Sequence, residues 1–409
     1  MQRGKALNRF LDFYIGIPLL NLLASLKRRG VYPERPNRIG LLFNPALGDT
    51  LLASAAIQDV RARFPQAKLI LFAASPNLAA AGLLPAIDVI EVLSLTRPLE
   101  SIRVLRQNNL DLMLDFTAWQ RLTAMFSLLS GARYKVGFER KKQYRHRGYD
   151  KSVLHRGDCH ELENLRRLTR VLGSLTACAP RLVVPGGPLP QTVLQGQQIV
   201  VFHAWASGPQ GWMREWPDEN WASLAKQLNV PGRVFLLTGS PTDRTRCDSL
   251  CRRLVAQGTR AEVLVGRGGL GEVARALTHA ELLVSVNTGI MHLGAILGVP
   301  TVSINGPTAA RRWGPVGPRV ANVCPDDGSG EFLDLGFEFR GKPRDTMQRI
   351  PVSDVLKAIY ALCEIQSSSA EIDSVPAAEA EPASLATQLE EPGEPAVPLQ
   401  MRSPGMNPL

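Results

Sequence analysis

The sequence has little cysteine and no long apolar run. Six cysteines scattered among 409 residues are too few for a disulfide framework. Cys247 and Cys251 lie one helical turn apart, but no CxxC pair accompanies them, so we interpret them as reduced cytosolic thiols and not as zinc ligands. No apolar run reaches the roughly 18 uncharged residues that span a bilayer. With 45% apolar residues, the chain is expected to be neither a transmembrane protein, nor a disulfide-rich secreted domain, nor wholly disordered.

The candidate loop at residues 286–292 lacks motifs of common nucleotide chemistry. The sequence has neither the GxGxxG dinucleotide pattern nor the GxxxxGK[ST] pattern of a phosphate loop at these residues, which argues against hydride transfer and P-loop phosphoryl transfer. It also has no DxD triplet in a strand-end loop, so nothing indicates a metal-dependent sugar transferase.

Charge is distributed unevenly along the chain. The net charge is +10, with seven Lys or Arg and two acids in residues 1–37, and one Arg and seven acids in residues 366–409. The region between these ends is therefore strongly basic. A basic body predicts an acidic partner, and nucleic acid, phosphorylated lipid and nucleotide are all candidates.

Residues 1–37 predict an amphipathic helix at a membrane surface. Basic clusters flank an apolar helical surface formed by Leu7, Phe10, Leu11, Tyr14, Ile15, Leu19, Leu22, Leu23 and Leu26. Asp12 and Asn21 interrupt this surface, and no small-residue cleavage site follows, so a signal peptide is not expected. We predict an interfacial helix on an anionic membrane. The alternative is a helix docked on the protein's own core.

The body of the chain predicts two α/β domains, at 38–188 and 189–365. Apolar strand-like runs alternate with helical stretches in both, which is typical of βαβ units and a parallel sheet. The expected strands are Arg38–Phe43, Lys68–Ala73, Val89–Leu93, Leu110–Asp115, Gln198–His203, Arg233–Leu237, Glu262–Val265, Leu282–Val286 and Thr301–Asn305. The expected helices include residues 49–64, Asp218–Leu228 and Gly289–Leu297. The proline-rich tail at 366–409 is expected to be disordered.

Ligands of doubly wound domains bind at the carboxyl ends of the strands, so strand-to-helix loops are the candidate sites. The first loop contains Gly48 and Asp49, whose carboxylate is a candidate general base or, alternatively, an ordinary first-turn acid. The second, residues 286–292, offers a helix N-terminus for an anion, although Thr288 could be a simple cap and His292 a buried helix histidine. The third, residues 306–315, could be a rigid turn carrying two exposed arginines.

The order and spacing of these motifs resemble glycosyltransferase family 9, the heptosyltransferase-like enzymes of lipopolysaccharide assembly. The resemblance covers roughly residues 38–363 and rests on Gly48-Asp49, Arg214 before Trp216-Pro217 and Trp221, and NTGIMH (287–292) leading to GPT (306–308) and RWGP (312–315). The DFYIGIPLL run (12–20) and the GFEF run (336–339) also look like this family. The resemblance implies a GT-B fold, in which two Rossmann-like parallel-sheet domains face a cleft, and an inverting transfer from a nucleotide-diphosphate sugar without a metal or other cofactor.

The resemblance also implies roles for individual residues. Asp49 maps to the general base, Thr288 and Gly289 to backbone phosphate ligands, and Arg214 to a phosphate contact. Asn287 replaces the family's sugar-binding acid, and it can still donate and accept hydrogen bonds although it carries no charge. The remaining donor-side candidates are Ser207 and His292.

The segment Arg133–Arg156 combines nine Lys or Arg with four aromatic residues. Such a segment could be a solvated face or bind single-stranded nucleic acid. In a two-domain transferase the N-terminal half holds the acceptor, so we predict that Gly48, Arg133 and Arg140 lie on the acceptor side, facing a phosphorylated glycolipid.

The sequence therefore predicts a glycosyltransferase on the cytoplasmic face of a membrane. The expected donor is ADP-heptose, the expected acceptor resembles a lipopolysaccharide core, and nucleic acid is not an expected partner. The Asn287 substitution motivates one alternative, a catalytically silent protein that binds a nucleotide sugar or a polyanion. A nucleotide-sugar epimerase with the same fold is another.

Overall fold

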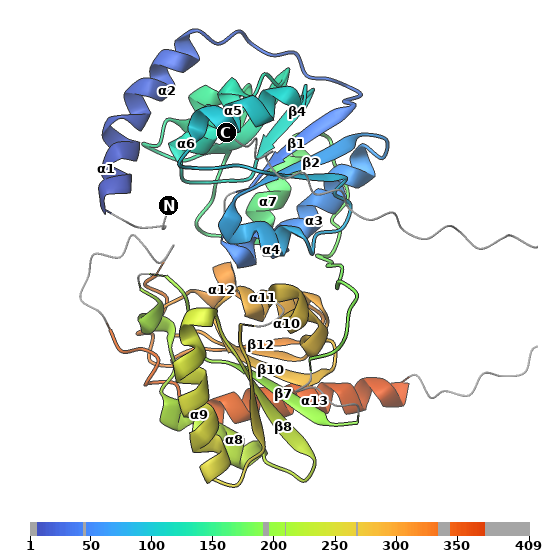
Figure 1. The fold of residues 1–409 in the computed structure, drawn as a ribbon, viewed down its shortest axis with the longest axis vertical. Coiled ribbons are helices and arrows are strands. Elements are labelled where there is room, and N and C mark those ends of the chain that lie inside the picture. The colour runs from blue at the N-terminus through green and yellow to red at the C-terminus, as the bar shows by residue number, and fades with distance from the viewer. Residues whose placement is uncertain are drawn as a thin grey trace, which may run out of the picture.

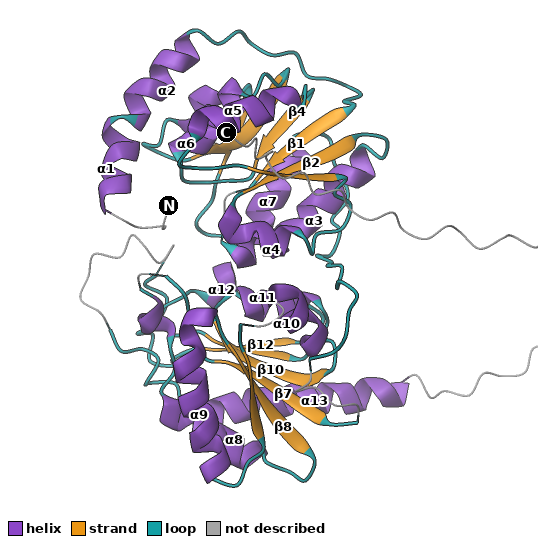
Figure 2. Ribbon diagram, viewed as in Figure 1, coloured by secondary structure: helices purple, strands orange, loops and turns teal. Residues whose placement is uncertain are grey.

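We obtained a computed structural model of the protein, which describes residues 6–43, 46–190, 196–208, 210–266, 269–333 and 344–372. The GFEF run at 336–339 and residues 373–409 of the predicted tail lie outside these ranges. The described chain forms two six-stranded sheets, one above the other in Figure 1, and all their strand pairs are parallel. Helices flank both sheets (Figure 2), which confirms the predicted α/β class.

The first sheet has the strand order β3-β2-β1-β4-β5-β6. Its strands are β1 (Arg38–Leu42), β2 (Lys68–Ala73), β3 (Val89–Val92), β4 (Leu112–Asp115), β5 (Tyr134–Glu139) and β6 (Lys151–Leu154). Its helices are α3 (Leu47–Arg63), α4 (Leu78–Ala81), α5 (Pro98–Gln107), α6 (Arg121–Leu129) and α7 (Glu161–Arg170). An order that runs outward in both directions from the first strand is the doubly wound, Rossmann-like arrangement.

The second sheet repeats this topology in the order β12-β11-β10-β7-β8-β9. Its strands are β7 (Gln198–His203), β8 (Arg233–Thr238), β9 (Ala261–Leu264), β10 (Ala280–Val286), β11 (Thr301–Ile304) and β12 (Val320–Val323). Its helices are α8 (Asp218–Leu228), α9 (Arg244–Ala256), α10 (Gly269–Leu277), α11 (Gly289–Ile296), α12 (Ala310–Trp313) and α13 (Val352–Ile372).

Both faces of the central strands are buried, as the uninterrupted apolar runs predicted. In β1, Ile39 and Leu41 pack in the cluster that includes α3 and α7, whereas Leu42 packs with α5 and α6 on the other face. A third cluster joins the two halves, because Leu51 of α3 packs in it together with Leu293 of α11. The two sheets are therefore connected by shared apolar contacts as well as by the chain.

The strands β5, β6 and β12 were not predicted. In β5, the polar Lys135 and the small Gly137 interrupt the apolar pattern. The Lys135 ammonium is buried 3.5 Å from the Asp150 carboxylate. A Cβ on Gly137 would lie 2.3 Å from the ring of Tyr149. Both features arise from tertiary packing, so a hydropathy pattern does not reveal them.

The N-terminal residues form two helices where one was expected, α1 (Ala6–Tyr14) and α2 (Gly16–Ser25). One face of this pair docks on the first half of the chain, since Leu20 is fully buried in a cluster with Ala124, Met125 and Tyr149. Ion pairs between Asp12 and Arg121 and between Lys27 and Asp150 fasten the pair at two points. The alternative prediction, a helix docked on the protein's own core, is therefore correct for this face.

The opposite face of the helix pair is exposed and apolar. We call it the α1–α2 apolar face, and it consists of Phe10, Leu11, Phe13, Tyr14, Ile15, Leu19, Leu22 and Leu26. The helix pair lies along the outer edge of the first half (Figure 1). None of the helices in the described ranges has the length and apolar content needed to cross a bilayer.

A buried ion pair between Asp115 and Arg145 organises the carboxyl end of β4. Both side chains are fully buried, and Nη2 of Arg145 lies 3.0 Å from Oδ2 of Asp115. The Tyr149 hydroxyl donates to the same carboxylate oxygen at 2.6 Å. Burial raises the pKa of Tyr149 well above its usual value, which keeps this hydroxyl protonated. Arg145 belongs to the basic segment 133–156, so the expectation of a solvated face is wrong for this residue.

We predict that Arg145→Met lowers the free energy of unfolding by about 3–5 kcal/mol, because it leaves the Asp115 carboxylate buried without its cation. Urea denaturation followed by circular dichroism measures this loss. Arg170→Met is the matched control, since Arg170 pairs with Glu163 on the exposed surface of α7 and should change stability far less. Equal losses in the two variants would show that the buried pair does not anchor the fold.

Candidate active site

The candidate residues gather at the switch points of the two sheets. In each sheet the chain leaves adjacent central strands, β1 and β4 or β7 and β10, in opposite directions, and a crevice opens at their carboxyl ends. Gly48 and Asp49 follow β1, the loop 204–211 follows β7, and Asn287 follows β10. Helices α3 and α4 of the first half face α11 and α12 of the second half (Figure 1).

The N-termini of α3 and α11 meet directly at two glycines. A Cβ on Gly48 would lie 2.7 Å from Cδ2 of His292 and 3.4 Å from Cα of Gly289. A Cβ on Gly289 would lie 2.2 Å from Cδ2 of Leu47. Only glycine permits this approach at either position. Two helix N-termini, each with a partial positive charge, therefore converge on the cleft.

Asp49 lies in the first turn of α3, next to this contact. The N-cap of α3 is Ala46, so Asp49 is a first-turn acid and not the cap. Asp49 is half-buried. A carboxylate in this position is stabilised by the helix N-terminus and borders the α11 contact through Gly48.

Arg214 connects two of the candidate loops. It ends a short 3-10 turn (Gly211–Arg214) and donates to the carbonyl oxygens of Ser207 at 2.8 Å and of Asn287 at 3.1 Å. Burial lowers the pKa of this guanidinium. The neighbouring Trp216 is buried and donates its indole N–H to the Ile350 carbonyl, which fixes the chain just beyond Arg214. The structure thus brings Arg214, Ser207 and Asn287 together.

The side chain of Asn287 is directed into the second half of the protein. Its amide nitrogen donates to Oδ1 of Asn305 at 2.7 Å and to the carbonyl of Trp313 at 3.0 Å. Asn305 in turn donates to Oδ1 of Asn322 at 2.9 Å. An aspartate at 287 could donate neither bond, so the substitution of the family's acid has a structural use: it ties the loop after β10 to the turn that contains Trp313.

Thr288 and His292 have different environments. Thr288 is the N-cap of α11, yet its side chain makes no capping hydrogen bond, and its hydroxyl lies 3.5 Å from that of Ser285. His292 is buried one turn later, against Gly48. Burial, followed by the neighbouring His160, lowers the pKa of His292 to about 3, so its imidazole is neutral at physiological pH. His292 therefore contacts α3 across the boundary between the halves.

A second contact across this boundary was missed in the sequence. His160, the N-cap of α7, accepts from the Leu162 N–H on Nδ1 and lies with Nε2 3.0 Å from the carbonyl oxygen of Gly314. Arg312 of α12 is buried 4.0 Å from the Glu161 carboxylate. Of the two arginines expected to be exposed, only Arg311 is exposed. Sequence signals for these contacts are weak, because His160 and Gly314 are 154 residues apart.

The acceptor-side candidates separate in the structure. Arg140 directly follows β5, at the carboxyl edge that also carries Gly48. Arg133 precedes β5, so it lies at the opposite edge of the sheet, where its guanidinium is 3.5 Å from the Asp111 carboxylate. The structure does not bring Arg133 to the cleft. No sequence pattern indicated this separation, because the six residues between the two arginines form the strand β5, which was not predicted.

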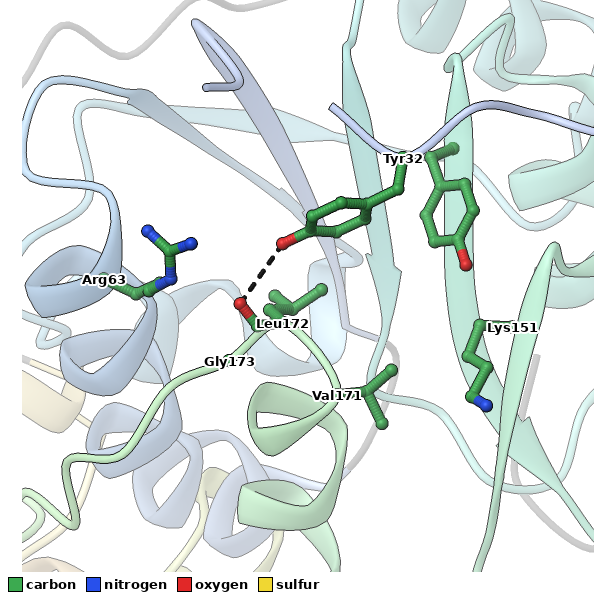
Figure 3. Close-up of a pocket in the computed structure, with 7 residues that line it drawn as sticks. Tyr32, Arg63, Lys151, Val171, Leu172 and Gly173 are labelled. Carbon is green, nitrogen blue, oxygen red and sulfur yellow. Dashed lines mark hydrogen bonds between the residues drawn. The ribbon is translucent and has the colours of Figure 1, made fainter. Parts of the chain in front are cut away.

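An open depression of about 400 Å³ also lies at the amino edge of the first sheet, opposite the carboxyl edge that carries Gly48 and Arg140. It is lined by Tyr32, Arg63, Tyr134, Lys151, Val171, Leu172 and Gly173 (Figure 3). The Tyr32 hydroxyl donates to the Leu172 carbonyl at 3.2 Å. This bond fixes the segment that joins α2 to β1. Within the described ranges, no group of three or more His, Cys, Asp or Glu residues is placed to hold a metal ion.

Comparison with known proteins assigns the family. Residues 99–332 match the model of glycosyltransferase family 9 (heptosyltransferase). Lipopolysaccharide heptosyltransferase 1 of Salmonella typhimurium is 33% identical over 127 residues, which are 31% of this chain and 38% of that protein. The chain thus aligns with little more than a third of this relative. Lipopolysaccharide heptosyltransferase 3 of Escherichia coli is 22% identical over 77% of this chain and 96% of its own length.

A solved structure shows the same fold. The E. coli ADP-heptose lipopolysaccharide heptosyltransferase II superposes with a TM-score of 0.66 and 20% identity, covering 81% of this chain and 99% of that chain. This likeness confirms the GT-B fold that the motifs implied, with two Rossmann-like halves facing a cleft. The family model spans more than half of the 409 residues. The chain therefore belongs to glycosyltransferase family 9, the heptosyltransferase family.

Proposed function

We propose that this protein is an inverting glycosyltransferase that moves a heptose from ADP-heptose to a lipopolysaccharide-core-like acceptor, without a metal. The observation that supports this proposal most is the meeting of two helix N-termini at Gly48 and Gly289. Displacement of a nucleotide diphosphate develops negative charge on the leaving phosphate, and preorganised N–H dipoles stabilise such charge. The similarity to the E. coli ADP-heptose lipopolysaccharide heptosyltransferase II and to other lipopolysaccharide heptosyltransferases suggests the proposed donor and acceptor.

Five of the candidate residues have a step in the proposed reaction. Asp49 accepts the proton of the acceptor hydroxyl as its oxygen forms a bond to the anomeric carbon. The bond from that carbon to the diphosphate oxygen breaks on the opposite face, and its electron pair leaves with the nucleotide. The N-terminus of α11, with Thr288 and Gly289, and the guanidinium of Arg214 hold the departing phosphates. Ser207 lies beside Arg214 and offers a hydroxyl to the same group.

The alternative of a catalytically silent nucleotide-sugar-binding protein was motivated by Asn287. The two hydrogen bonds that its amide donates give a structural reason for an asparagine at this position. Under the transferase proposal, these hydrogen bonds of Asn287 hold the loop after β10 in position.

We predict that Asp49→Asn retains donor binding but reduces turnover by roughly 10²-fold or more, because it removes the proton acceptor. Steady-state transfer from ADP-heptose measures turnover, and calorimetry with the same nucleotide sugar measures binding. Glu100→Gln is the matched control, since Glu100 also lies in the first turn of its helix, α5, and should leave turnover unchanged. Near wild-type turnover in Asp49→Asn would refute the assignment of Asp49 as the general base.

Arg214→Ala is expected to weaken donor affinity by about 1.5–3 kcal/mol, roughly 10- to 100-fold, through loss of one charge-assisted phosphate contact. Titration of ADP by calorimetry measures this change. Arg214→Lys keeps a positive charge but cannot bond to both loop carbonyls, so its affinity should be intermediate. Arg252→Ala, an exposed arginine of α9, is the control. Unchanged ADP affinity in Arg214→Ala would place this residue outside the donor site.

We also propose that the α1–α2 apolar face holds the protein on the cytoplasmic surface of an anionic membrane, where a glycolipid acceptor would be presented. Eight large apolar side chains are exposed together on a helix pair that is itself docked firmly through Leu20. Arg28 and Arg29 follow this pair directly and are exposed. Apolar insertion with adjacent basic residues is the recognition mode of interfacial helices.

We predict that Leu22→Ser/Leu26→Ser abolishes sedimentation with phosphatidylglycerol vesicles, because both side chains are exposed and serve no internal packing. Arg28→Gln/Arg29→Gln should weaken binding at least tenfold at low salt, at about 1 kcal/mol per basic residue. Leu99→Ser, at an equally exposed leucine of α5, is the control. The membrane proposal would be refuted if the full-length protein did not sediment with these vesicles. It would also be refuted if the Leu22→Ser/Leu26→Ser variant bound them as the wild-type protein does.

A further inference from the structure

Two loops on the acceptor half are built as a single unit at the carboxyl edge of the first sheet. The first, residues 116–120, follows β4, and the second, residues 140–150, joins β5 to β6. β4 lies next to β1, the strand that leads to Asp49, and β5 lies next to β4. With strands spaced about 4.8 Å apart, the ends of β1 and β5 are about 10 Å apart. Both loops are therefore near the proposed reaction centre.

Two arginines bind these loops to each other reciprocally. Arg145, from the second loop, donates to the carbonyl oxygens of Thr117, at 2.6 Å, and of Gln120 in the first loop. Arg121, at the end of the first loop, donates to the carbonyl oxygen of Gln143, at 2.9 Å, in the second. The carbonyls that Arg145 holds lie on either side of Trp119. The backbone that carries this indole is consequently held at both ends by a fully buried cation.

Trp119 and Arg140 form a stacked pair across the two loops. The Arg140 guanidinium carbon lies 3.7 Å from the centroid of the Trp119 ring, which is well within cation–π range. Both residues are half-buried, so each keeps part of its surface in solvent. The guanidinium covers one face of the indole, and the ring also packs against the apolar cluster of the first half, so the pair presents the exposed part of the indole together with the guanidinium.

The second loop also has strained backbone and concentrated positive charge. Lys142 and Tyr144 have φ angles of 66° and 59°, a left-handed conformation that is costly for bulky residues and clusters at functional sites. Residues 140–149 contain no Asp or Glu. The side chains of Lys141, Lys142 and Arg147 are exposed. The nearby Glu139 carboxylate accepts a hydrogen bond from the Ser152 hydroxyl.

We infer that the Trp119–Arg140 pair is a subsite for a phosphorylated sugar of the acceptor, and that it determines acceptor specificity. The exposed part of the indole contacts the apolar face of the sugar next to the accepting residue, while Arg140 binds its phosphate through charge-assisted hydrogen bonds. Arg145 and Arg121 position the subsite. This inference rests on the proposed function, because it assigns the acceptor to the first half of the chain.

Direct binding of a soluble ligand tests the subsite separately from transfer. The probe is a delipidated, phosphorylated lipopolysaccharide-core oligosaccharide, compared with the same oligosaccharide after phosphatase treatment, in calorimetric titrations of the full chain. Wild-type protein should prefer the phosphorylated form at least tenfold. Arg140→Gln should remove this preference while the affinity for the dephosphorylated form stays unchanged. Trp119→Leu should weaken both forms, and Trp119→Phe should restore most of that loss.

Lys68→Gln is the charge-matched control, because Lys68 is exposed at the amino edge of β2. It should retain the wild-type preference for phosphate. If Arg140→Gln instead weakens sedimentation with phosphatidylglycerol vesicles but retains the oligosaccharide preference, the phosphate it binds is a lipid headgroup and the subsite is refuted. A wild-type protein with no preference also overturns the inference. Phosphate-selective binding without any sugar transfer would uphold the subsite and reject the proposed enzyme activity.

Discussion

The contact between Gly48 and Gly289 is the constraint on which the cleft depends. A side chain on either glycine would collide with the other half of the protein, which would separate the N-termini of α3 and α11. While they touch, a first-turn carboxylate on one helix and an anion-binding N-terminus on the other lie close together. That proximity is what a displacement reaction needs, because proton removal and stabilisation of the leaving group occur in the same transition state.

Contacts around this point fix the position of the two halves of the protein relative to each other. Leu51 and Leu293 pack in one apolar cluster, His160 bridges to Gly314, and the buried Arg312 approaches Glu161. Burial lowers the pKa of His292 to about 3, so this imidazole adds no positive charge to the boundary beside Gly48. A boundary that excludes water also strengthens the electrostatic interactions of the groups that line it.

Much of the architecture could be read from the sequence, because a parallel sheet is buried on both faces and its strands are plain apolar runs. β2, β7 and α8 have the predicted bounds, and most other predicted strands differ by one or two residues. The strand β5 was missed, because a buried lysine and a glycine break its pattern. The N-terminal region was predicted as one interfacial helix at a membrane surface, with docking on the protein's own core as the alternative. It is two helices, and Leu20 became buried only because α6 offers a complementary apolar surface.

The sequence by itself determined where the candidate loops lie in the fold, since Gly48-Asp49, Arg214 and Asn287-Thr288-Gly289 each follow a recognisable strand or precede a recognisable tryptophan. Tertiary structure decided what those residues contact. It placed Arg133 and Arg140 at opposite edges of one sheet, directed the Asn287 amide toward Asn305, and buried Arg145 on Asp115. These outcomes depend on pairings between residues 18 to 30 positions apart. Local sequence patterns report the conformation of a segment but not the partner that it meets in space.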